Sequence, residues 1–99
     1  MLLTEVIEIL EEFDVDQTIY VADNAPDAVA AVDYETDDGD IPASAKGMCY
    51  LLEVSRARDA IRVWSDWREG RQPTLDEKVQ AVIYYAENDA FMPGTKRGG

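Results

Sequence analysis

The apolar and polar positions of residues 2–13, LLTEVIEILEEF, repeat with the period of an α-helix. The apolar side chains share one face: Leu2, Leu3, Val6, Ile7, Ile9, Leu10 and Phe13. The other face carries glutamates three and four residues apart, and no lysine or arginine relieves their repulsion. The pattern predicts an N-terminal helix with an apolar inner face and an acidic outer face.

Three shorter apolar segments follow, and their composition is typical of strands. Residues 18–22 and 28–34 flank an Asp23–Asp27 turn and predict a hairpin, although the alanines of the second segment leave a helix open. Residues 35–46 predict a loop too polar for a core. Residues 47–52 are apolar throughout, so this third strand is expected at the centre of the sheet, with Cys49 as a small buried hydrophobe.

The C-terminal part predicts two amphipathic helices, over residues 53–69 and 75–90. Gly70 suits the end of the first helix. Thr74 and Glu77 have the spacing of a capping box at the start of the second. The inner face of this second helix is expected to hold Leu75, Val79, Val82, Ile83, Ala86 and Ala90.

The order of these elements defines the expected fold class. A helix, two or three strands and two helices indicate an α+β domain, with a small antiparallel sheet covered by helices on at least one face. Ninety-nine residues correspond to one domain. We expect that domain to span residues 1–92 and residues 93–99 to form a flexible C-terminal tail.

The composition excludes several kinds of chemistry. The chain has no histidine, which removes imidazole general bases, histidine-dependent nucleophiles and histidine-ligated metals. Its single cysteine allows neither an intrachain disulfide nor a cysteine-based zinc site. No apolar run is long enough to span a membrane, and glutamates stand where a signal peptide needs basic residues. These features predict a cytoplasmic protein that is not an enzyme and has no cofactor.

Charge is the most informative feature of the sequence. The formal net charge is −12, from 21 acidic and nine basic residues. Residues 1–45 hold thirteen of the acids and no base, whereas residues 46–99 hold all nine bases and eight acids. A purely solubilising or salt-adapted surface would spread its acids over the whole molecule. The asymmetry therefore favours an acidic binding surface, with general solubilisation as the alternative.

Such a surface can occupy lysine and arginine sites that are built for phosphates. The sequence thus predicts a non-catalytic inhibitor of a nucleic-acid-binding protein or nuclease, of the DNA-mimic, anti-CRISPR, anti-restriction or immunity-protein class. Direct nucleic-acid binding is not expected from so acidic a chain. The candidate partner-binding residues are Glu5, Glu8, Glu11, Glu12, Asp14, Asp16, Asp33, Glu35, Asp37, Asp38 and Asp40.

Two other interpretations of the carboxylates are weaker. The acids from Asp33 to Asp40 resemble a calcium loop, but Gly39 comes one position too late and Ser44 stands where the final glutamate belongs. A loose, low-affinity divalent site stays open. Carboxylate pairs for acid–base catalysis are expected by chance among 21 acids, and a small domain offers little room for a deep pocket.

A possible aromatic interface is the remaining candidate. Val63, Trp67 and Tyr84 lie at the edge or on the outside of the predicted helices, where they could contact a second copy or a partner. This leaves a homo-oligomeric structural domain as the alternative function. The nearby Arg56, Arg58 and Arg62 are expected to pair with Asp59 and Asp66, or to hold the acidic half in place.

Overall fold

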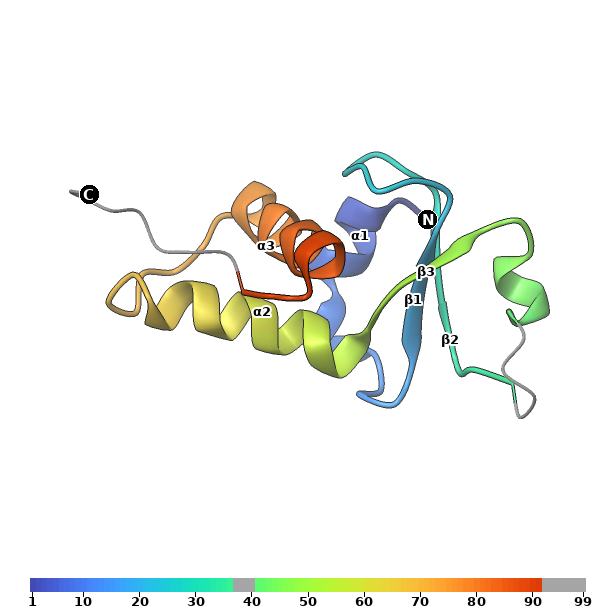
Figure 1. Ribbon diagram of the computed structural model, residues 1–99, viewed down its shortest axis with the longest axis horizontal. Helices are drawn as coiled ribbons and strands as arrows, with labels where there is room; N and C mark the ends of the chain where they lie inside the picture. The colour runs from blue at the N-terminus through green and yellow to red at the C-terminus, as the bar shows by residue number, and fades with distance from the viewer. Residues whose placement is uncertain (37–40, 92–99) are drawn as a thin grey trace.

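The elements follow the expected order in the computed structural model, which describes residues 1–36 and 41–91 (Figure 1). The α+β prediction is confirmed. Two short 3₁₀ segments, η1 and η2, add to the expected elements. In chain order the elements are α1 (Leu3–Glu8), η1 (Leu10–Glu12), β1 (Thr18–Val21), β2 (Ala30–Asp33), η2 (Ala43–Ala45), β3 (Cys49–Glu53), α2 (Val54–Asp66) and α3 (Leu75–Asn88).

The sheet is antiparallel, and its strand order is β2-β1-β3. The central position predicted for residues 47–52 is therefore wrong: β1 is central and β3 is at an edge. All four residues of β1 are buried, whereas Cys49 and Tyr50 at the start of β3 are exposed. The prediction that Cys49 is buried is also wrong, because an edge strand is covered less completely than a central one.

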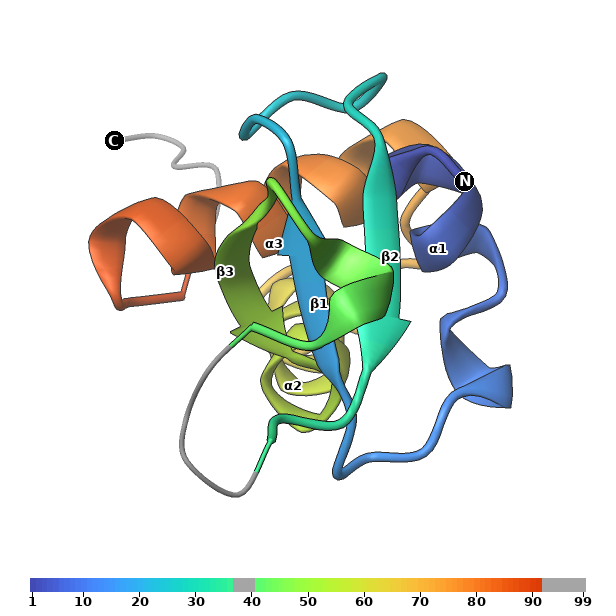
Figure 2. The same cartoon turned by 90° about the vertical axis from the view of Figure 1, so that its right-hand side faces the viewer.

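Burial of the whole of β1 requires cover on both faces of the sheet, since successive side chains point to opposite sides. Ile19 and Val21 belong to the main core with residues of α1, α2 and α3. On the other face, the segment that contains η2 crosses the sheet (Figure 2). Pro42 and Ala45 of that segment are buried, so the loop predicted as too polar for a core contributes to one.

The N-terminal helix is shorter than the predicted 2–13. Its apolar face is as expected, because Leu3, Val6, Ile7 and Leu10 are buried. However, α1 ends at Glu8 and a 3₁₀ turn follows. The glutamates beyond that point would repel one another at the negative end of the helix dipole, which disfavours a longer α-helix.

The connection between α2 and α3 follows the sequence signals. Gly70 has a φ of +79°, which suits glycine. The capping box is confirmed: Glu77 N–H donates to Thr74 Oγ1 at 3.2 Å, and Thr74 N–H donates to Glu77 Oε1 at 2.9 Å. Ala90 lies beyond the end of α3 and is exposed, so its placement on the inner face is wrong.

Trp64, near the end of α2, packs against two arginines of this connection. Its side chain is 4% exposed, and the guanidinium carbons of Arg68 and Arg71 lie 4.1 and 4.7 Å from the centre of its rings. Arg71 also pairs with Glu77 of α3 at 2.9 Å. The two arginines therefore cover the indole, and Arg71 also connects it to α3 through Glu77.

Candidate acidic interface

The carboxylates of the first 45 residues lie on α1, on η1, in the connections of the sheet and at the end of β2. Ten of the thirteen belong to the described residues, and Asp37, Asp38 and Asp40 lie outside them. Most basic residues lie on α2, on α3 and in the connection between them. Figure 1 shows these two helices toward one end of the long axis and the sheet toward the other, with α1 packed against α3.

The ion pairs are concentrated on the helical side. Within residues 1–36 and 41–91 there are four, and three of them use acids after position 45: Glu53–Arg56, Asp59–Arg62 and Glu77–Arg71. The fourth joins Arg58 of α2 to Glu11 at 2.7 Å. Nine of the ten described carboxylates of the acidic half thus have no ion pair with any described base. The predicted Arg62–Asp59 pair is confirmed, whereas the described residues contain no ion pair of Asp66.

Glu5 has a structural role at the start of α1. Its Oε1 accepts a hydrogen bond of 2.6 Å from the backbone N–H of Leu2, at the start of α1. The carboxylate also lies at the positive end of the helix dipole. A variant at Glu5 would therefore disturb the helix start as well as the surface charge.

Two of the candidate carboxylates, Asp14 and Asp33, each accept a hydrogen bond from a side-chain hydroxyl group. The Tyr34 hydroxyl donates to Asp14 Oδ2 at 2.8 Å, and the Ser44 hydroxyl donates to Asp33 Oδ2 at 2.7 Å. These bonds lower the pKa of both carboxyl groups, with additional backbone donors to each. The same contact with Asp14 raises the pKa of the Tyr34 hydroxyl. Asp14 and Asp33 therefore keep their negative charge at lower pH than free aspartates do.

Replacing Tyr34 with phenylalanine should raise the pKa of Asp14 toward the ordinary value of about 4. The variant loses the largest cause of the lowered pKa, which is the tyrosine hydroxyl. A carboxyl group with a lowered folded-state pKa stabilises the protein above its unfolded-state pKa, and that contribution is lost as the pH falls through the folded-state value. An NMR titration of the aspartate carboxyl carbons measures the change, and Asp33 serves as the internal control. An unchanged Asp14 titration would contradict this assignment.

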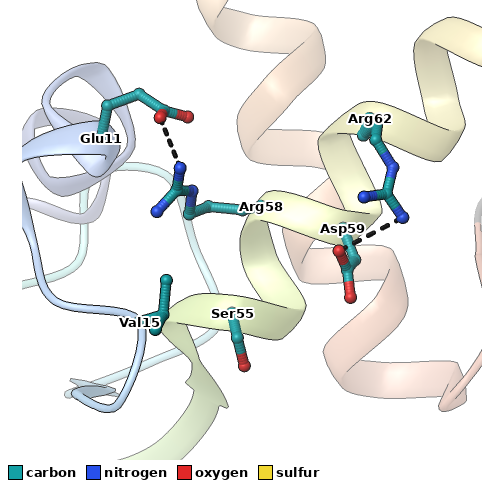
Figure 3. A pocket seen from close by; sticks show the side chains of 6 residues that line it. All are labelled: Glu11, Val15, Ser55, Arg58, Asp59 and Arg62. Atoms are coloured by element: carbon teal, nitrogen blue, oxygen red, sulfur yellow. Dashed lines mark hydrogen bonds and ion pairs between the residues drawn. The ribbon is translucent and has the colours of Figure 1, made fainter.

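A hollow of about 420 Å³ lies between α2 and the segment of η1 and Val15. Its lining residues are Glu11, Val15, Ser55, Arg58, Asp59 and Arg62. Figure 3 shows Arg58 extending from α2 toward Glu11, while Asp59 and Arg62 pair further along the helix. Val15 and Ser55 are not among the site residues that the sequence predicts, because no local pattern in it brings the two segments together.

The three candidates for an aromatic interface differ in exposure. Trp67 is 53% exposed and contacts the edge of Phe91, with 6.1 Å between ring centroids. Val63 and Tyr84 are only partly exposed. The next residue, Tyr85, is buried and packs on Phe91 with 5.0 Å between centroids. Trp67 is therefore the most accessible of the three.

The part of the chain that the structure describes contains no group of three or more cysteine, aspartate or glutamate side chains that could hold a metal ion. No described helix has the length and apolar character needed to cross a membrane. Residues 37–40 of the calcium-like segment, which hold three of its five acids, lie outside the described residues.

These features define a small acidic α+β domain in which most of the described carboxylates before position 45 have no ion pair with a described base. The chain belongs to the family described as domain of unknown function DUF7716, whose model matches residues 1–94. No curated protein and no solved structure matches the chain.

Proposed function

We propose that this domain is a non-catalytic binding protein that inhibits a nucleic-acid-binding protein or nuclease by occupying its basic surface. The observation that supports the proposal is the ion-pair distribution: nine of ten described carboxylates in the acidic half have no basic partner among the described residues. Carboxylates kept close together without bases repel one another and destabilise the compact state. A basic partner would remove that repulsion on binding.

The proposal is also supported by the sign of the charge, which the acidic half shares with a phosphate backbone. Lysine and arginine sites that bind phosphates also accept carboxylates, with charge-assisted hydrogen bonds. A concentrated negative field attracts a basic partner over several ångströms and makes association fast and sensitive to salt. DNA mimics, anti-CRISPR and anti-restriction proteins and immunity proteins of basic nucleases share this physical mechanism.

Two charge-reversal variants test the proposal. The first replaces Glu12, Asp16 and Glu35 with lysine, because these side chains are exposed and have no ion pair in the described structure. The control replaces Asp66, Glu69 and Glu87, which are exposed acids of the helical side. Both variants change the net charge from −12 to −6. We expect the first to weaken binding of a basic protein at least about tenfold and the control to change it by less than about twofold.

The measurement is retention of basic proteins from a lysate of the source cell on the immobilised domain, with elution in a salt gradient. Retained proteins are identified and tested for nucleic-acid binding or nuclease activity with and without the free domain. Equal losses in both variants would reduce the effect to net charge, and no loss in either would overturn the proposal. Light scattering of the same samples tests the alternative: a stable dimer that retains no partner would favour a homo-oligomeric domain, with Trp67 as its accessible contact.

A further inference from the structure

The hollow between η1 and α2 combines one apolar side chain, Val15, with polar side chains that can still make hydrogen bonds. Val15 is 44% exposed and offers an accessible apolar side chain, and its sequence neighbours Asp14 and Asp16 are exposed acids. Ser55 Oγ has no hydrogen-bond partner among the described residues. Glu11 and Asp59 each use a single oxygen for an ion pair, Oε1 with Arg58 and Oδ1 with Arg62. The second oxygen of each carboxylate is therefore available to a further donor.

We infer that this hollow binds an arginine side chain of the basic partner. This inference rests on the proposed function, because it identifies which part of the acidic surface holds the partner in place. The aliphatic part of an arginine can pack on Val15 while its charged end stays polar. The guanidinium carries five N–H donors in a fixed plane, which suits carboxylate oxygens and a hydroxyl group around one apolar wall.

The charges around the hollow favour a cation over an anion. Inside it, the positive charges of Arg58 and Arg62 are each balanced by a carboxylate at 2.7 and 3.3 Å. Glu12, Asp14 and Asp16 do not line the hollow, but they are exposed residues of the chain segment that carries Glu11 and Val15, and they have no ion pair with any base that the structure describes. An incoming anion would have to displace an internal carboxylate and enter this negative field. An incoming arginine would share the carboxylates of Glu11 and Asp59 with Arg58 and Arg62, through the oxygens that those ion pairs leave free, and gains from the same field.

The inference is tested by filling the hollow with a cation of the domain's own. Val15→Arg places a guanidinium where the partner's side chain would lie. Val29→Arg is the matched control, because Val29 is 49% exposed, lies outside the hollow and gives the same change in charge. We expect Val15→Arg to weaken binding of the retained basic protein at least about tenfold, the size of a hot-spot contribution, and Val29→Arg to weaken it less than about threefold. Far-UV circular dichroism during urea unfolding shows whether both variants keep the fold.

A second measurement needs no natural partner. The isotope-labelled domain is titrated with blocked hexa-arginine and hexa-lysine peptides, and the backbone amide signals are followed by NMR. Saturable shifts at Val15, Ser55 and Asp59 that are larger with hexa-arginine and absent in Val15→Arg are expected. Shifts of equal size with both peptides, spread over the whole acidic half, would overturn the inference.

The two proposals fail in different ways. Equal effects of Val15→Arg and Val29→Arg, together with loss of binding in the lysine variant of Glu12, Asp16 and Glu35, would overturn the arginine site and leave the proposed function standing. Failure to retain any basic protein would overturn the proposed function, and the peptide titration would then decide on the hollow alone.

Discussion

Replacing Trp64 with alanine should lower the free energy of unfolding by about 3–5 kcal/mol, the usual cost of truncating a buried aromatic side chain. The indole is 4% exposed and lies beneath the guanidinium groups of Arg68 and Arg71. Its removal leaves a cavity beside α2 and takes away the surface on which both arginines stack. Small domains are stabilised by roughly 5–15 kcal/mol in total, so this one change should bring the protein close to its stability limit.

Guanidinium chloride unfolding followed by far-UV circular dichroism measures the effect without relying on tryptophan fluorescence. Trp67→Ala is the matched control, since it makes the same chemical change three residues away at a side chain that is 53% exposed. We expect it to cost less than about 1 kcal/mol, as most surface substitutions do. Similar losses in the two variants would show that Trp67 is covered in solution, for example by a second copy, and would contradict the difference in burial.

The sequence was sufficient for the elements but not for their order in the sheet. Period and capping are local properties, so the apolar face of α1 and the capping box of Thr74 and Glu77 were predicted correctly. The edge position of β3 depends on where the connection over residues 35–46 carries the chain, and no local pattern encodes that path. The apolar character of residues 47–52 predicts burial on both faces. In the structure, however, Cys49 and Tyr50 are exposed at the start of the edge strand β3.

The candidate interface, too, is only partly predictable from local sequence patterns. The one-sided distribution of acids is visible in the sequence, but the sequence does not reveal which acids lack basic partners. The pairing of Arg58 with Glu11 joins residues 47 positions apart, and the contact of Tyr34 with Asp14 joins residues 20 positions apart. Both contacts depend on the packing of α2 and of β2 against the rest of the molecule. Val15, an ordinary loop residue in the sequence, gains its significance only from the helix opposite it.

Replacing Ile19 with alanine is the second change with a large expected effect, about 2–5 kcal/mol. Ile19 is fully buried in the central strand, lies opposite Val32 on one side and Leu52 on the other, and belongs to the core shared with all three helices. Ile19→Val removes a single methylene group at the same position and should cost about 0.5–1.5 kcal/mol.

The position of Ile19 also makes it a test of whether the acidic and helical sides unfold together. One core connects the sheet to α1, α2 and α3, so the domain is expected to lose all its structure in one transition. In urea, the helical circular dichroism signal and the NMR signals of the Tyr34 ring should therefore shift to the same lower midpoint in Ile19→Ala. If the Tyr34 signals lost their native environment first while the helices persisted, the sheet and its carboxylates would form a separate unit. The surface that carries Asp14 and Asp33 would then depend on binding for its order, rather than on the core beneath it.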